Sequence, residues 1–126
     1  MPTGLPYLIH TNRELGLMLA GRKPLAMFAD AEGRFPDVIV RYMRLFDRQV
    51  ASGQLVRHDQ LDPPADGQSY VLHRIMFALP DQRWRIDAMI ELKASREWTP
   101  AHERREGELL GYEDWMNDIW IKHVYG

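Results

Sequence analysis

Apolar residues recur at helical spacing over residues 36–52, which makes this stretch the clearest helix in the sequence. They follow one another at intervals of three and four residues, while arginine and aspartate occupy the opposite side. Pro36 suits the first turn, where its missing N–H would have no partner in any case, and Gly53 suits the position just past the end. We therefore expect an amphipathic helix from residue 36 to residue 52.

The N-terminal part of the chain is expected to form a short helix followed by a buried strand. Thr11 and Glu14 have the spacing of a capping box in front of an apolar stripe, which predicts a helix over residues 12–20. Gly21 is placed to end that helix. The continuous apolar run over residues 25–29 has the length of an interior strand.

Two more helices are expected near the C-terminus. Thr99 followed by Pro100 is a helix cap with proline in the first helical position, and Gly111 is placed to end that helix. A last helix is expected over residues 113–123, where large aromatic side chains form a stripe. A helix this short needs packing against the rest of the protein to be stable.

A long β-hairpin is expected over residues 69–93. Two runs rich in β-forming residues, 69–79 and 83–93, are separated by a short segment that begins with Pro80. Apolar and polar residues alternate in the second run, which is typical of a strand with one buried face. The residues expected on that buried face are Trp84, Ile86, Ala88, Ile90 and Leu92.

The same alternation would bring charged side chains together on the outer face of the hairpin. This polar patch would contain Arg74, Arg85, Asp87 and Glu91. Because the two carboxylates would neutralise the two arginines, the patch is a poor surface for nucleic acid, and a solvated sheet face is the simpler interpretation.

These elements predict an α+β fold made of one domain, residues 1–126. We expect a small antiparallel or mixed sheet built on the hairpin at 69–93, extended by strands at 25–29 and 54–57, with helices packed mainly on one face. A chain of 126 residues is near the usual size of one domain. A loose region is expected over residues 58–68, which contain two prolines and a glycine.

The composition narrows the class of protein without identifying it. The chain has no cysteine, which excludes disulfides and cysteine-based zinc sites and favours a reducing compartment. A net charge of −2 means that nucleic-acid binding would need a local basic patch. The apolar runs are much shorter than the roughly 20 residues that span a bilayer, and residues 1–6 lack the features of a secretory signal. We therefore expect a cytoplasmic protein without membrane contact.

Three segments resemble parts of a group of small, uncharacterised bacterial proteins. They are residues 17–28 (LMLAGRKPLAMF), 84–88 (WRIDA) and 109–115 (LLGYEDW). The resemblance implies a bacterial origin. Since it brings no known activity, ligand or partner with it, no functional residue is carried over.

His102 and Glu106 form the pattern closest to a metal site. They are four residues apart on an expected helix, so they share a face and could hold a cation between an imidazole and a carboxylate. A zinc protease motif would need a second histidine at position 106, and the spacing identifies no third ligand. An exposed helix face with glutamate–arginine pairs is the more common outcome of such a pattern.

His73 and the neighbouring pair His58 and Asp59 are the candidates for a catalytic site. Alternation places His73 on the apolar face of the hairpin, as a catalytic imidazole or, more commonly, as a hydrogen-bonded residue at the margin of the core. His58 beside Asp59, and likewise His10, could act as a general base, although such pairs also arise by chance. Neither a glycine-rich phosphate loop nor a nucleophile elbow is present, and we expect no cofactor.

The aromatic residues of the C-terminus are the candidates for binding a partner: Tyr112, Trp115, Trp120 and Tyr125. If Trp115 and Ile119 fill an intramolecular groove, Trp120 lies on another side of the helix and would face a protein partner, most simply in a homodimer. In the competing account, the helix over residues 99–110 folds over Trp120 and hides it.

Three function classes follow from these features. The leading hypothesis is a non-catalytic binding or regulatory module that acts through protein–protein contacts. The alternatives are an acid–base or metal-assisted hydrolase that uses histidine and carboxylates, and a nucleic-acid-binding protein. A deep pocket holding His73 or His102 with carboxylates would favour an enzyme, whereas an exposed aromatic patch would favour a binding module.

Overall fold

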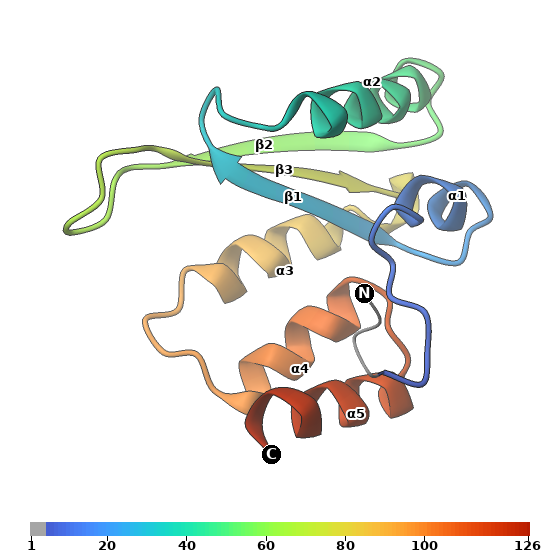
Figure 1. Cartoon of the computed structure of the whole chain (residues 1–126). Coiled ribbons are helices and arrows are strands. Elements are labelled where there is room, and N and C mark those ends of the chain that lie inside the picture. The colour runs from blue at the N-terminus through green and yellow to red at the C-terminus, as the bar shows by residue number, and fades with distance from the viewer. Residues whose placement is uncertain (1–4) are drawn as a thin grey trace.

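Three antiparallel strands form the sheet around which the described part of the chain is built (Figure 1). A computed structural model of the protein describes residues 5–126; residues 1–4, on which the expectation about a secretory signal partly depends, lie outside the described residues. The strands are β1 (Leu25–Ala31), β2 (Val56–Asp62) and β3 (Leu72–Ala78). Their order is β1-β3-β2, so the central strand β3 pairs with both of the others. The predicted α+β class with a small antiparallel sheet is confirmed.

Helices cover both faces of this sheet, so the expectation that they pack mainly on one face is wrong (Figure 1). α2 (Asp37–Ala51) lies along one face, and α1 (Glu14–Leu19) lies near the start of β1. On the opposite face α3 (Trp84–Lys93) packs against β3, and α4 (Pro100–Leu109) and α5 (Asp114–Tyr125) follow beyond it.

Strand β3 is buried on both faces, and this divides the core into two layers. Ile75 and Phe77 pack with Phe46 of α2, whereas Met76 packs on the other side with Met89 of α3. All five side chains are at most 2 % exposed. Residues 75–78 of this strand are continuously apolar and buried, as a strand covered on both sides requires.

The second half of the predicted hairpin is a helix, so that prediction is wrong. After a 3-10 turn at Pro80–Gln82 the chain enters α3, in which Ile86 and Met89 are buried and Trp84 is 50 % exposed. Both edges of β3 are already occupied by β1 and β2, which leaves no place for another strand beside it. Ile86 and Ile90 fit either interpretation, because residues four apart lie on one side of a helix and of a strand alike.

The hairpin that does form consists of β2 and β3, joined by residues 63–71. β2 is longer than the expected strand at 54–57 and includes the start of the predicted loose region at 58–68. Its run of exposed charged and polar residues concealed the strand in the sequence. Such residues are typical of an edge strand, where they hinder pairing with the edge of another chain.

One of the two predicted helix caps is confirmed. The hydroxyl of Thr99 accepts the backbone N–H of His102 and caps α4. Thr11 does not cap α1, which begins at Glu14 without a side-chain cap, because Asn12 has a positive φ of 67° and keeps the residues before it out of the helix.

A side chain at Gly111 should destabilise the fold more than one at Gly53. Both glycines have positive φ, 92° and 85°, which costs an L-residue about 1–2 kcal/mol. At Gly111 the added Cβ would also lie 2.5 Å from Cδ of Pro24, whereas at Gly53 it meets nothing within 4 Å. We expect Gly111→Ala to lower the free energy of unfolding by roughly 1–3 kcal/mol more than Gly53→Ala, as measured by urea denaturation. Equal losses would contradict the close contact with Pro24.

Candidate functional site

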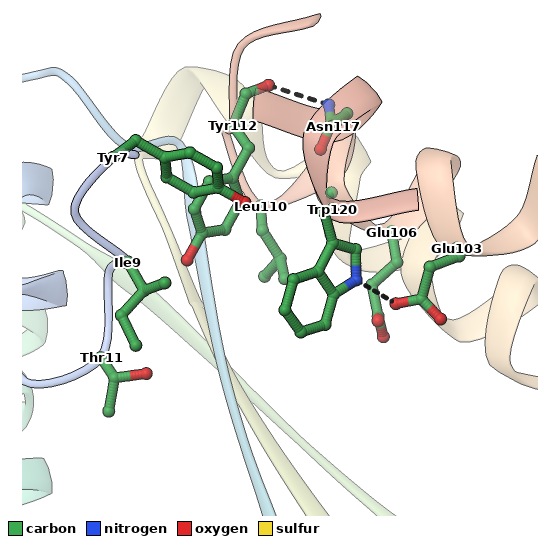
Figure 2. A pocket seen from close by; sticks show the side chains of 10 residues that line it. Tyr7, Ile9, Thr11, Glu103, Glu106, Leu110, Tyr112, Asn117 and Trp120 are labelled. Atoms are coloured by element: carbon green, nitrogen blue, oxygen red, sulfur yellow. Dashed lines mark hydrogen bonds between the residues drawn. The ribbon is translucent and has the colours of Figure 1, made fainter. Parts of the chain in front are cut away.

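A pocket of about 260 Å³ lies between the N-terminal segment and the two C-terminal helices (Figure 2). Tyr7, Ile9 and Thr11 line it from the N-terminal segment. The other side is formed by α4, α5 and the turn between them, which contribute mainly Glu103, Glu106, Leu110, Tyr112 and Trp120. Segments from opposite ends of the described chain therefore enclose one hollow.

Three aromatic rings form much of the wall of the pocket. The rings of Tyr7 and Tyr112 stand at 64° to each other with their centroids 6.1 Å apart. Figure 2 shows the indole of Trp120 between these tyrosines and the two glutamates. Tyr7 also contacts Trp115 edge-on, with a centroid distance of 5.6 Å, so a more exposed indole lies beside the pocket. Aromatic walls of this kind suit apolar groups and cations.

Glu103 and Glu106 supply the charge in the pocket. Each carboxylate oxygen of Glu103 accepts one indole N–H, from Trp98 and from Trp120, both at 2.9 Å. Glu106 is paired with the ammonium of Lys93. Among the ion pairs of residues 5–126 none involves Glu103. Its charge is therefore held in place by neutral donors and is not cancelled by a paired cation.

A buried lysine fastens the N-terminal segment to the end of α4. Lys23 is 2 % exposed. Its Nζ donates to the Leu110 carbonyl at 2.6 Å and lies 2.7 Å from Nδ1 of His10. The imidazole of His10 stacks on the Tyr112 ring at 3.7 Å, and its backbone N–H donates to the Tyr112 hydroxyl at 2.8 Å. Two lining residues of the pocket, Leu110 and Tyr112, are thus positioned by this cluster.

Burial shifts the pKa values of all three titratable groups in the cluster. It lowers the pKa of Lys23 to about 7, an effect that the nearby charge of Glu14 partly offsets. Burial, together with the charges of Lys23 and Arg13, lowers the pKa of His10 to about 4. Burial raises the pKa of Tyr112. At neutral pH His10 is therefore uncharged, and its Nδ1 can accept a hydrogen bond from Nζ of Lys23.

Gly107 lets α4 and α5 approach closely beside the pocket. A Cβ at this position would lie 2.1 Å from Oδ1 of Asn117, which is 3 % exposed. The Asn117 Nδ2 donates to the Tyr112 carbonyl at 3.2 Å and ties α5 to the turn that precedes it. The absence of a side chain at Gly107 therefore allows the contact between the helices that form one wall of the pocket.

The predicted partner-binding aromatics divide into two pairs. Tyr112 and Trp120 line the pocket, whereas Trp115 is 47 % and Tyr125 is 44 % exposed. The predicted orientation, with Trp115 inward and Trp120 outward, is wrong. Trp120 is held by its hydrogen bond to Glu103 of α4, which is close to the competing account in which that helix folds over it.

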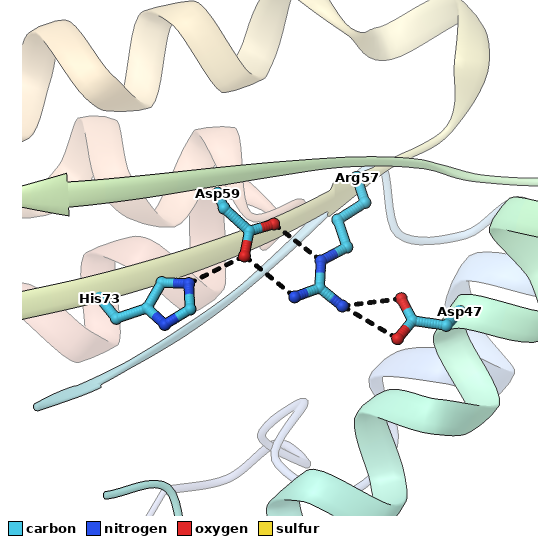
Figure 3. A network of polar contacts seen from close by, with 4 residues as sticks. All are labelled: Asp47, Arg57, Asp59 and His73. Carbon is cyan, nitrogen blue, oxygen red and sulfur yellow. Dashed lines mark hydrogen bonds and ion pairs between the residues drawn. The ribbon is translucent and has the colours of Figure 1, made fainter. Parts of the chain in front are cut away.

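His73 and Asp59 come together in a polar network on the α2 side of the sheet (Figure 3). Nε2 of His73 lies 2.8 Å from Oδ2 of Asp59, whose carboxylate also accepts two hydrogen bonds from Arg57. Arg57 in turn pairs with Asp47 of α2 at 2.8 Å. The hydrogen bond from Arg57 is the main reason that the pKa of Asp59 falls to about 2. The network joins β2 and β3 to α2.

The expected pairing of His58 with Asp59 does not form, because neighbouring residues on β2 point to opposite faces of the sheet. Asp59 pairs with His73 of the neighbouring strand instead. His73 was expected at the margin of the core, and its hydrogen bond to a carboxylate there fits the more common of the two interpretations. Neither His58 nor His73 lines the pocket between the N-terminal segment and the C-terminal helices.

His102 and Glu106 share a face of α4 but turn to different partners. Nδ1 of His102 lies 2.7 Å from the Thr99 hydroxyl, and its Nε2 lies 3.2 Å from the Ser95 hydroxyl. Glu106 is paired with Lys93. Within residues 5–126, no three histidine, aspartate or glutamate side chains are placed to hold a metal ion.

The predicted polar patch does not form, because the hairpin that would have carried it is absent. Arg74 on β3 pairs with Asp62 of the neighbouring strand. Arg85 on α3 donates to Gln82 and to backbone carbonyls at the end of α4. Asp87 and Glu91 are exposed on α3. The patch is replaced by separate local contacts.

Two residues that line the pocket, Tyr7 and Glu103, were not singled out from the sequence. Nor was the buried Lys23, which holds two lining residues in place. Tyr7 precedes the first predicted element, and nothing near it indicates a contact with α5. Lys23 is one of three consecutive polar or breaking residues, 22–24, which reads as an exposed turn. Glu103 lies in a charged run that is typical of a solvated helix face. Only tertiary packing brings these residues together.

Comparison of the chain with known protein families, with curated proteins and with solved structures found no match. Within residues 5–126, none of the helices combines the length and the apolar character that crossing a membrane demands. The functional assignment therefore depends on the geometry of the pocket.

Proposed function

We propose that this protein is a non-catalytic binding module whose ligand occupies the pocket between the N-terminal segment and α4 and α5. The observation that carries the proposal is a preformed, largely apolar hollow into which a few polar groups converge, as in most ligand sites. A cavity of about 150 Å³ already accepts benzene. The volume of about 260 Å³ therefore suits a small ring with a short substituent, or one side chain of a partner protein.

Binding is favoured over acid–base catalysis because the titratable groups near the pocket already have partners. Glu103 accepts two indole N–H groups, and Glu106 is paired with Lys93. The imidazole–carboxylate pair of His73 and Asp59 belongs to a different part of the molecule and is fixed by an arginine. Nucleic-acid binding has less support, since the arginines of the expected patch are engaged separately.

A protein partner is the source of ligand that fits the surroundings of the pocket best. Trp115 is exposed and touches Tyr7, which lines the pocket. Large aromatics beside a hollow are typical of interfaces, where they supply much of the binding energy. A partner, or a second copy of this chain, would cover Trp115 while placing one group in the pocket. The lack of cysteine favours a cytoplasmic setting for this contact.

A small neutral probe should bind in the pocket and be detected at Trp120. The chain has four tryptophans, so four indole N–H signals can be followed in the ¹⁵N-labelled protein. We expect benzyl alcohol to shift the Trp120 signal and to leave that of Trp84, which is exposed on α3, unchanged. Tyr7→Ala should weaken this binding several-fold, because it removes one wall, whereas Trp84→Ala should not. A Trp120 signal that stays in place would refute the proposed site.

A further inference from the structure

We infer that the group bound in this pocket is an organic ammonium on an apolar stem, an inference that rests on the proposed function. The same chemistry is found in small amines and quaternary ammonium compounds and in the lysine side chain of a partner protein. Two features of the pocket carry the inference: its aromatic walls and the charge of Glu103.

The aromatic walls suit a cation as well as an apolar group. The face of an aromatic ring is negative, and a cation within about 6 Å of the ring centroid is attracted to it. Tyr7, Tyr112 and Trp120 line the same hollow from two sides (Figure 2). Rings that surround a hollow in this way can contact several methyl or methylene groups of one ammonium ion at once.

Glu103 adds a negative charge that neutral ligands cannot use. Its oxygens accept hydrogen bonds from the indoles of Trp98 and Trp120, which fix the carboxylate without neutralising it. Glu106 is paired with Lys93. The two carboxylates that line the pocket therefore leave a net charge of one, which lies on Glu103. A neutral ligand would remove water from Glu103 without replacing it by a favourable charge, which is costly. An anion would be repelled.

Lys23 is another cation close to the pocket, and it competes little for Glu103. Its Nζ is engaged by the Leu110 carbonyl and His10, and the side chain is 2 % exposed. Burial lowers the pKa of Lys23 to about 7, so that only part of the population carries its charge at neutral pH. Because Nζ of Lys23 is held by these two partners, the lysine leaves the carboxylate of Glu103 to the proposed ligand.

The test compares a cation with its uncharged isostere. Choline and 3,3-dimethyl-1-butanol have nearly the same shape, because a carbon replaces the nitrogen. We expect choline to bind at least tenfold more tightly, followed at the Trp120 indole signal. Glu103→Gln should bring the ratio of the two affinities close to one, since the amide oxygen still accepts an indole N–H but carries no charge. Asp87→Asn, which removes an exposed carboxylate of α3, should leave the ratio unchanged.

The source of the ammonium is resolved by a second pair of probes, Nα-acetyl-lysine methylamide and its norleucine analogue. Preferential binding of the lysine compound, as tight as that of choline, indicates a side chain of a partner. Binding of choline alone indicates a free small molecule. Equal affinity of the wild-type protein for choline and its isostere overturns the inference, whether or not the Glu103 variant folds. In that case a shift of the Trp120 indole signal with benzyl alcohol still supports a binding pocket at this site. If no probe shifts the signal, the proposed function is contradicted as well.

Discussion

The free energy of unfolding should rise by roughly 3 kcal/mol between pH 7 and pH 9.5, because Lys23 is buried. Burial lowers the pKa of this lysine from 10.5 to about 7 in the folded protein. Between these two values the unfolded chain binds about one proton more than the folded chain, so that raising the pH favours folding by about 1.4 kcal/mol per unit. Below pH 7 both forms are protonated and this contribution is constant.

Other groups limit the pH range in which the effect of Lys23 can be isolated. Burial raises the pKa of Tyr112 and of Tyr42, so unfolded tyrosines lose their protons first and stability falls again above about pH 10. The pKa of His10 is lowered from 6.5 to about 4, which makes stability fall as the pH drops from 6.5 towards 4. The window from pH 7 to 9.5 lies between these effects.

Two variants identify the group responsible. Lys23→Met should abolish most of the rise, whereas Lys122→Met, which removes an exposed lysine of α5, should retain it. The measurement is urea denaturation at several pH values. The ¹³Cε signal of Lys23 should also titrate near pH 7. The same slope in the wild-type protein and in Lys23→Met, with a ¹³Cε signal that titrates near pH 10, would rule out this explanation.

Ile86→Asp should lower the free energy of unfolding by about 4 kcal/mol, the largest effect that we expect from a single substitution. Ile86 is 4 % exposed and belongs to the core layer between β3 and the helices α3 and α4. Aspartate there would either hold an unpaired charge away from water or take up a proton at neutral pH, and both are costly. The apolar contacts of the isoleucine are lost as well.

Arg83→Ala is the matched control, since Arg83 is exposed just before α3, and we expect it to change stability by less than about 0.5 kcal/mol. The variant Trp84→Ala distinguishes between the helix α3 and the predicted strand. In the strand Trp84 and Ile86 would both be buried, whereas in α3 Trp84 is 50 % exposed. A loss for Trp84→Ala as large as that for Ile86→Asp would contradict the helix.

Local signals in the sequence were sufficient where an element is determined by its own residues. Thr99 and Pro100 place the start of α4, and the apolar stripe after Pro36 places α2. Local signals failed over residues 84–93, where the apolar pattern fits the repeat of a helix and that of a strand. Which of the two forms depends on whether β3 still has a free edge. That is a property of the assembled sheet, which no short segment contains.

The pocket was predicted only in part, for the same reason. The aromatic residues Tyr112 and Trp120 were identified as binding residues, but which way Trp120 points depends on the hydrogen bond that Glu103 accepts from it. Burial of Lys23 requires His10 and Leu110, which are far from each other in the sequence. Contacts between such distant residues leave no periodic pattern in the chain, so sequence reasoning could not place them.

The pocket's two walls come from opposite ends of the described chain, and His10 and Tyr112 are joined across a sequence separation of 102 residues. During synthesis, the segment around His10 leaves the ribosome long before α5 does, so the hollow cannot exist until the last helix has emerged and docked. A ligand that recognises this hollow binds only chains in which α5 has docked and adds RT ln(1 + [L]/Kd) to their stability. The ligand would therefore protect chains with a docked α5 from proteolysis while leaving chains without it unprotected.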